Sequence, residues 1–376
     1  MASANSKKYR VLVVDDSAFM RKVLEKIFNA DDQLQVVGHA KDGREAIALS
    51  ESLKPDVITM DLNMPHMDGL AATAHIMTNS PRPIVIVSSE SKEGAASTLK
   101  SLELGAIDFV AKPGGGIDLD MQSVKEELLR KVRVAAKVRV VRTASRLANA
   151  VQAPPKNPAA RPAASQAPSP SSMASDNLRF PVVVLAASTG GPATVMRLAP
   201  GFTRDFPAAV MLVQHMPASF TSQYALQLAE FTGIRVKEAE SNDTVLPGTL
   251  YVCPGGQHLR VSPTGRIQLD ATTGRIEGYL PNIDVTMESV AAFAGSMSIG
   301  VVLTGMGSDG ARGARAIKQA GGLVIAQDEA TCVIFGMPAE AIKAGIVDQT
   351  LGIDDIYAAI EKRVLGLCKA TPVGAR

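Results

Sequence analysis

Three residue types that together can hydrolyse an ester each follow an apolar segment in the second half of the chain. Ser188 comes directly after Val182–Ala187, and His215 comes directly after Val210–Gln214. Asp309 follows a third apolar segment through a glycine-rich turn. A serine hydroxyl is a weak nucleophile until a base accepts its proton, and a carboxylate can orient that base. The pattern therefore predicts a serine hydrolase with Ser188 as nucleophile, His215 as base and Asp309 as the orienting carboxylate.

The residues around these three leave alternatives open. Ser188 is followed by Thr189–Pro192, which allow a tight turn into a helix, so Ser188 could also be an ordinary helix cap. His258 is a rival base and Asp328 a rival carboxylate. Glycines flank Met306, so we expect its backbone N–H to donate to the oxyanion of a tetrahedral intermediate.

A second group of reactive residues lies in the first third of the chain. Asp15 and Asp16 end the first predicted strand, and Asp61 ends the third. Ends of parallel strands meet at one sheet edge, and converging carboxylates repel unless a hard cation such as Mg²⁺ neutralises them. Ser88 and Lys112 end two further strands, where they could hold phosphoryl oxygens on a nucleophilic Asp61. Taken singly, such residues could merely cap helices.

Strand and helix patterns alternate twice along the chain, which is typical of parallel α/β sheets. The first series predicts a flavodoxin-like, five-stranded parallel domain, with a helix over Ser17–Phe28. Its expected strands are Tyr9–Val14, Gln35–Ala40, Val57–Met60, Ile84–Val87 and Asp108–Ala111. A charged helix over Met121–Val141 follows.

The composition then changes. From Val151 to Asp176, 18 of 26 residues are Ala, Pro or Ser, which predicts a linker without a core. The second series predicts a doubly wound, mostly parallel domain of the α/β hydrolase type, with antiparallel hairpins over Thr249–Asp270. Its other expected strands are Val182–Ala186, Ala209–Gln214, Ser298–Thr304 and Leu323–Gln327.

Composition restricts the class of protein. The 376 residues suffice for two domains, and the net charge of +2 is well mixed, which gives no argument for nucleic acid. No helix-turn-helix pattern is recognisable. The three cysteines are widely spaced, which fits a reducing compartment. Without a signal peptide or a long apolar segment, we expect a soluble cytoplasmic protein with no membrane insertion.

One motif favours a different function. Gly305–Gly310 matches the GxGxxG pattern of dinucleotide-binding loops, and Asp328 follows at a suitable distance. Its place near the end of the chain leaves no room for a second mononucleotide half. Asp309 would also place a negative charge inside the pyrophosphate loop. A dinucleotide-binding effector is therefore the weaker alternative.

The first domain resembles the receiver domain of two-component response regulators over residues 8–125. The matching residues are Val11–Asp16, Asp61–Pro65, Met67–Gly69, Ser88 and Lys112–Pro113. The resemblance implies that Asp61 takes phosphate from a histidine kinase, with Mg²⁺ held by Asp15, Asp16, Asp61 and the Asn63 carbonyl. Phe109 stands at the family's aromatic switch position, although it could equally be a core residue.

The second half resembles the catalytic domain of CheB-type protein-glutamate methylesterases of bacterial chemotaxis over residues 179–368, which leaves 126–178 as helix and linker. The matching stretches are Ala187–Pro192, Gln214–Met216, Pro254–Gly256, His258–Leu259, Leu303–Gly307 and Asp309–Gly310. The resemblance implies a phosphorylation-activated enzyme that removes methyl esters from chemoreceptor glutamates, deamidates receptor glutamines and needs no cofactor for the esterase reaction. A non-catalytic, phosphorylation-controlled binding module is the alternative.

Overall fold

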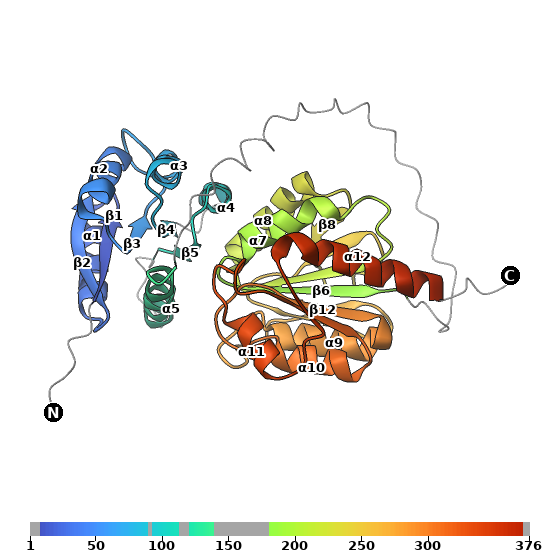
Figure 1. Cartoon of the computed structure of the whole chain (residues 1–376). Coiled ribbons are helices and arrows are strands. Elements are labelled where there is room, and N and C mark those ends of the chain that lie inside the picture. The colour runs from blue at the N-terminus through green and yellow to red at the C-terminus, as the bar shows by residue number, and fades with distance from the viewer. Residues whose placement is uncertain (1–7, 89–91, 113–119, 139–179, 371–376) are drawn as a thin grey trace, which may run out of the picture.

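The computed structural model describes residues 8–88, 92–112, 120–138 and 180–370, so the expected linker at 151–176 lies outside it. Two α/β units are visible, one blue to green and the other green to red (Figure 1). Among the described residues, no helix combines the length and the apolar character that crossing a membrane requires.

The first unit is a five-stranded parallel sheet with the strand order β2-β1-β3-β4-β5, as predicted. Alternate residues of β1 enter two different cores, Leu12 and Val14 on one face and Val11 and Val13 on the other. Its strands are β1 (Tyr9–Val14), β2 (Leu34–Ala40), β3 (Val57–Met60), β4 (Ile84–Ser88) and β5 (Asp108–Ala111). Its helices are α1 (Ala18–Asn29), α2 (Gly43–Leu53), α3 (Gly69–Asn79), α4 (Lys92–Glu103) and α5 (Asp120–Ala135).

Helix α5 ends earlier than expected and spans residue 125, where the receiver resemblance stops. It ends at Ala135, whereas the charged pattern predicted a helix to Val141, of which residues 139–141 lie outside the described part. Leu128 and Val132 are fully buried against the first sheet. The apolar face of α5 therefore packs on the core of the first unit.

The second unit is built on a seven-stranded sheet with the order β14-β13-β12-β6-β7-β9-β8, in which every pair is parallel. Its strands are β6 (Val182–Ala187), β7 (Ala209–Gln214), β8 (Arg235–Glu238), β9 (Thr249–Val252), β12 (Ser298–Val302), β13 (Leu323–Gln327) and β14 (Gln349–Leu351). Its α-helices are α7 (Gly191–Leu198), α8 (Ala218–Phe231), α9 (Ile283–Ala294), α10 (Ala311–Gln319), α11 (Met337–Lys343) and α12 (Ile353–Ala370).

Helices cover both faces of this sheet, which confirms the doubly wound prediction. Helices α7, α8 and α12 lie on one face, and α9, α10 and α11 lie on the other (Figure 1). In β6, Val183 and Leu185 face the first group, whereas Val182 and Val184 face the second. A strand buried on both faces reads as a continuous apolar run, as this segment does.

Two strand predictions need correction. The hairpin prediction over Thr249–Asp270 is wrong for β9, which pairs parallel to β7 and β8 in the main sheet. Only β10 (His258–Val261) and β11 (Ile267–Asp270) form the antiparallel pair. Strand β12 ends at Val302, because the Thr304 N–H bonds to the Gln327 side chain, at 2.9 Å, instead of continuing the ladder.

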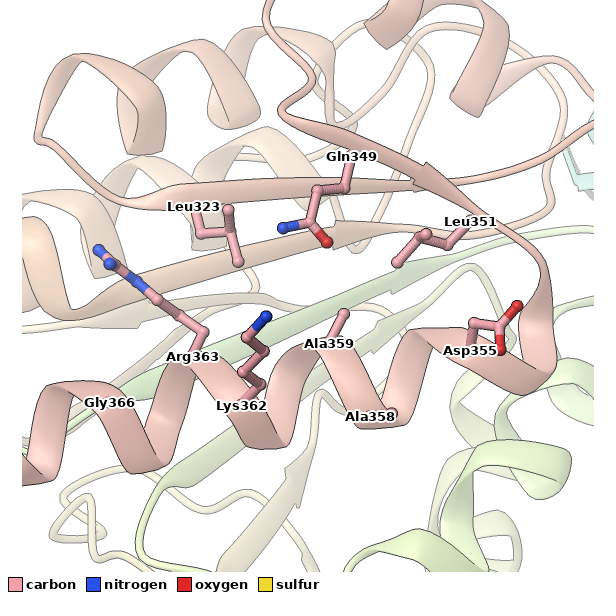
Figure 2. Close-up of a pocket in the computed structure, with 9 residues that line it drawn as sticks. All are labelled: Leu323, Gln349, Leu351, Asp355, Ala358, Ala359, Lys362, Arg363 and Gly366. Carbon is pink, nitrogen blue, oxygen red and sulfur yellow. The ribbon is translucent and has the colours of Figure 1, made fainter.

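The second unit contacts the first unit and also carries a groove on its surface. Helix α4 of the first unit packs against α7 and α8, and the Phe109 and Phe220 rings lie 4.4 Å apart between their centroids. A groove of about 540 Å³ lies between α12 and the β13–β14 edge (Figure 2). None of the residues that line this groove belongs to the Ser188 group, so it is not the candidate active site.

Candidate active site

Ser188 lies in the turn that joins β6 to α7, where it is almost completely buried. Its N–H donates to the Thr304 carbonyl, at 3.1 Å, which ties the turn to the end of β12. Gly190 adopts the left-handed conformation with φ of +76°, and a Cβ there would lie 2.5 Å from Val333 Cβ. The chain therefore needs glycine at position 190, two residues after Ser188, to make this turn.

His215 follows β7, the neighbour of β6, and its ring reaches Ser188 across the sheet edge. The backbone N–H of His215 donates to Ala187 O, at 3.1 Å, and its Nδ1 lies 3.1 Å from Ser188 Oγ. The Gln214 side chain donates to the carbonyls of Ser188, at 2.9 Å, and His215, at 3.1 Å. The two reactive residues are thus held together by both backbone and side-chain bonds.

Asp309 completes the contact from the loop between β12 and α10. Its Oδ2 lies 2.8 Å from His215 Nε2 and also accepts from the Ile283 N–H, at 2.8 Å. Its Oδ1 accepts from the Asp284 N–H, at 3.0 Å. These two N–H groups belong to the first turn of α9, where the helix dipole favours a negative charge. The start of α9 therefore fixes the carboxylate and compensates its charge.

The hydrogen bonds assign the His215 tautomer. An ionised carboxylate only accepts, so Nε2 carries the proton that Asp309 binds. The lone pair of Nδ1 then faces the Ser188 hydroxyl. This is the reverse of the serine protease template, in which Nε2 takes the serine proton. The arrangement can still move a proton from serine to a leaving group.

The loop beside Ser188 presents a backbone donor. Among the described residues, no hydrogen-bond partner is found for the half-buried Met306 N–H, whereas its neighbour Gly305 donates to Ile334 O, at 3.1 Å. A Cβ on Gly305 would lie 2.8 Å from Ser188 Cβ, so this loop passes directly against the serine. Met306 as the oxyanion donor remains a prediction.

The structure separates the rival residues from Ser188. His258 is fully buried, with Nε2 2.7 Å from Gly274 O and Nδ1 accepting from the Asn282 N–H at 3.1 Å, so both ring nitrogens are engaged in holding a loop. Asp328 accepts from the Thr331 N–H and hydroxyl, at 3.0 and 2.6 Å. No contact joins either residue to His215 within the described part of the chain.

Two neighbours of the group were not anticipated from the sequence. The Tyr279 ring stacks on the His215 ring, with centroids 4.4 Å apart and an interplanar angle of 14°. Asp284 accepts from the Gly310 and Gly313 N–H groups, at 2.9 and 2.6 Å, and burial raises its pKa to about 6. Tyr279 lies in an irregular loop, where no periodic pattern could have marked it.

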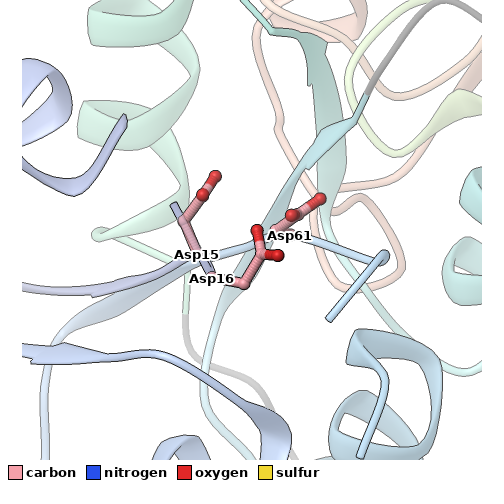
Figure 3. A group of neighbouring side chains, drawn as sticks. All are labelled: Asp15, Asp16 and Asp61. Carbon is pink, nitrogen blue, oxygen red and sulfur yellow. The ribbon is translucent and has the colours of Figure 1, made fainter. Parts of the chain in front are cut away.

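The carboxylates of the first unit also converge. Ligand oxygens of Asp15, Asp16 and Asp61 lie within 4.8 Å of one another (Figure 3). The Lys112 ammonium lies 2.9 Å from Asp15 and 2.7 Å from Asp61. Burial raises the pKa of Asp61, against the opposing effect of Lys112. Burial lowers the pKa of Lys112. Hydrogen bonds to Asp61 and Asp15 raise this pKa by more than burial lowers it, so the net shift is upward.

The remaining predicted receiver residues lie near this cluster. Ser88 is buried at the end of β4, and its carbonyl accepts from the Lys112 N–H at 2.8 Å. Asn63 lies two residues beyond Asp61, and its N–H is 3.4 Å from Asp61 Oδ1. The cluster offers three carboxylates and no nitrogen or sulfur ligand, which suits Mg²⁺. The ring of Phe109 is buried and contacts the second unit through Phe220.

Comparisons with known proteins match both halves of the chain. The model of the CheB methylesterase family matches residues 183–360, and that of the response regulator receiver domain matches residues 11–122. A protein-glutamate methylesterase/protein-glutamine glutaminase of Symbiobacterium thermophilum is 42% identical over 97% of this chain and 99% of its own. A second such protein, from Nitratidesulfovibrio vulgaris, is 44% identical over 93% of this chain and 98% of its own.

A solved structure also matches part of the chain. The crystal structure of the Thermotoga maritima CheB methylesterase catalytic domain is 38% identical, covers 49% of this chain and 99% of its own, and has a TM-score of 0.48. The two full-length relatives and both domain models agree on one family. The chain therefore belongs to the CheB methylesterase family and carries a response regulator receiver domain ahead of the methylesterase domain.

Proposed function

We propose that Ser188, His215 and Asp309 hydrolyse glutamate γ-methyl esters, and γ-amides of glutamine, on a protein substrate. The observation that carries the proposal is the continuous path from Ser188 Oγ through the His215 ring to Asp309, with contacts of 3.1 and 2.8 Å. Both lie within the range in which a proton can be transferred or an imidazolium stabilised. The relatives are named protein-glutamate methylesterase/protein-glutamine glutaminase, and both of these activities are hydrolytic.

The proposed reaction has two stages. Ser188 Oγ attacks the γ-carbonyl carbon while its proton moves to His215 Nδ1, and the tetrahedral oxyanion faces the Met306 N–H. Collapse breaks the bond to the methoxy oxygen, which takes the proton from His215 and leaves as methanol. Water then attacks the acyl-serine with His215 as base, which frees the glutamate carboxylate and restores Ser188. With glutamine, ammonia leaves instead of methanol.

We assign the receiver residues from the acidic cluster. Asp61 accepts the phosphoryl group from a histidine kinase, and Ser88 and Lys112 contact its oxygens. Asp15, Asp16, Asp61 and the Asn63 carbonyl would hold Mg²⁺, which would neutralise negative charge during transfer. The esterase reaction is proposed to need no cofactor, because its nucleophile, base and oxyanion donor all come from this chain.

The substrate is assigned from the family and not from the geometry. We propose that it is the cytoplasmic part of methyl-accepting chemoreceptors, which would give adaptation in a chemotaxis-type pathway. The kinase and the receptor would both present their reactive groups in the cytoplasm, so a cytoplasmic location is part of this proposal. Neither nucleic acid nor membrane insertion has a role in it.

Phosphorylation is proposed to act through the contact between the two units. Helix α4 packs against α7, which starts three residues after Ser188, and Phe109 packs on Phe220 of α8. The unphosphorylated receiver would restrict the Ser188 cleft, and phosphate on Asp61 would loosen the contact. A shift from mostly closed to mostly open needs about 5 kcal/mol of differential stability. Deleting residues 1–150 should then raise basal activity; a slower fragment would refute inhibition.

The test follows methanol release from a methylated receptor fragment in H₂¹⁸O, with and without a small phosphodonor such as acetyl phosphate. Wild-type protein should release methanol, place one ¹⁸O atom in each new glutamate carboxylate, and respond to the phosphodonor. Asp61→Asn serves as the matched control, since it should keep basal turnover and lose the response. Release of methanol without ¹⁸O in the glutamate would contradict hydrolysis by water.

A further inference from the structure

Tyr279 occupies a defined place in the candidate active site, although it lies in an irregular loop. It ends a tight turn in which the N–H of Ile276 donates to Tyr279 O, at 3.0 Å, and the N–H of Tyr279 donates to Ile276 O, at 2.9 Å. Its half-buried ring lies parallel to the His215 imidazole, within stacking distance. One face of the imidazole is therefore covered by the Tyr279 ring, and the turn that carries this ring is closed by two backbone hydrogen bonds.

His258 anchors this turn at both ends. Its Nε2 donates to Gly274 O, at 2.7 Å, before the turn, and its Nδ1 accepts from the Asn282 N–H, at 3.1 Å, after it. The Asn282 side chain accepts from the Val285 N–H, at 3.0 Å, and so caps α9, whose first N–H groups hold Asp309. The tyrosine and the carboxylate that contact His215 are thus positioned by one helix start.

The Tyr279 hydroxyl points toward the loop that carries the predicted oxyanion donor. A Cβ placed on Gly307 would lie only 2.1 Å from Tyr279 Oη, and Gly307 directly follows Met306. No hydrogen bond from this hydroxyl to another residue occurs in the described part of the chain. The hydroxyl is therefore available to a ligand at the point where the scissile group would bind.

We propose that Tyr279 acts in the hydrolysis in two ways: its ring keeps the imidazole in the plane in which it contacts both Ser188 and Asp309, and its hydroxyl donates a hydrogen bond to the bound γ-acyl group. The inference rests on the proposed function, because it assigns a role within that reaction. His258, which was a rival base in the sequence, acts in this scheme as the anchor of the Tyr279 turn.

The ring also acts on the charge that His215 acquires. When Nδ1 takes the serine proton, the imidazolium lies against the electron-rich face of the phenol, an arrangement that stabilises cations. The charged groups around the pair are Asp309 on the His215 side, Glu277 in the same turn, and Arg130 on α5. Glu277 and Arg130 have opposite signs, and both stay unchanged in the two Tyr279 variants below.

The experiment measures methanol release and its pH profile in the full-length protein with acetyl phosphate, for Tyr279→Phe, Tyr279→Leu and the same-turn control Glu277→Gln. Tyr279→Phe keeps the ring and should lose about five- to tenfold in kcat with an unchanged profile. Tyr279→Leu should lose about 30-fold or more, and the apparent pKa on the acid side of kcat/KM should fall by about half a unit. The control should match the wild type, and equal Tm values would show that all variants fold.

The outcomes separate this inference from the proposed function. An inactive wild-type protein would overturn the proposed function and this inference with it. An active wild type with a Tyr279→Leu variant of unchanged kcat and pH profile would overturn the role of the ring alone. A Tyr279→Phe variant as fast as the wild type would overturn the role of the hydroxyl. A purely structural role would lower Tm without moving the pH profile.

Discussion

Replacing Asp309 by asparagine tests the proton path at its least exposed point. Asp309 is 1% exposed and accepts three hydrogen bonds, from His215 Nε2, Ile283 N–H and Asp284 N–H. An amide has one accepting oxygen; at the Oδ1 position this oxygen would accept from the Asp284 N–H, and the NH₂ group would take the place of Oδ2. Its NH₂ group would then face His215 Nε2 and force that nitrogen to accept.

The consequence is a reversed imidazole tautomer. With Nε2 accepting, the ring proton moves to Nδ1, which faces Ser188 Oγ at 3.1 Å and can no longer take the serine proton. The same tautomer reversal in a serine protease costs about 10⁴ in kcat, or about 5.5 kcal/mol of transition-state stabilisation. We expect a loss of that order here with little change in KM, because Asp309 does not touch the substrate.

The assay is initial-rate methanol release under saturating phosphodonor, with Tm measured in parallel. Asp328→Asn is the matched control and should leave the rate within twofold of wild type, since within the described residues the Asp328 carboxylate accepts hydrogen bonds from Thr331 alone. A loss of less than tenfold in Asp309→Asn would refute the assignment of the orienting carboxylate. So would an equal loss in both variants.

Three further predictions follow from contacts at the two sites. Gly305→Ala should lower kcat at least tenfold, because the new Cβ would lie 2.8 Å from Ser188 Cβ; a wild-type rate would show that the loop can move aside. Burial raises the pKa of Asp284 to about 6 from 3.8, so the native state binds this proton more tightly than the unfolded state. The stability of wild type relative to Asp284→Asn should therefore fall as pH rises from about 4 to about 6, by on the order of 3 kcal/mol, measured by denaturant unfolding; a flat difference would contradict this. Lys112→Ala removes the ammonium 2.7 Å from Asp61 and should abolish the response to acetyl phosphate while basal methanol release persists.

The sequence was most informative where polar residues follow buried strands. Ser188 and His215 directly follow β6 and β7, which are neighbours in the sheet, so their meeting follows from the parallel topology. The same argument brings Asp15 and Asp61 together, because β1 and β3 pair directly. Both sheets were predictable because strands buried on two faces leave long apolar runs.

The sequence was least informative at edges and in loops. Strand β8, Arg235–Glu238, is largely polar because it lies at the sheet edge, and β14 has only three residues, so neither leaves a buried-strand pattern. Strand β9 was assigned to a hairpin because its nearest apolar neighbour in sequence is β10, whereas its actual partners are β7 and β8. The position of Tyr279 depends on a turn that His258 anchors. The contacts of His258 with this turn are long-range, so no local sequence pattern encodes them.

The central claim is that the Ser188 hydroxyl is the nucleophile, and its most direct test is methanol release by full-length Ser188→Ala under saturating acetyl phosphate. Removing an activated serine typically costs a factor of about 10⁵ or more, so we predict release no faster than in buffer, from a protein that melts like the wild type. A non-catalytic binding module would instead show no turnover in either protein. A folded Ser188→Ala variant that releases methanol within tenfold of the wild-type rate would contradict the account.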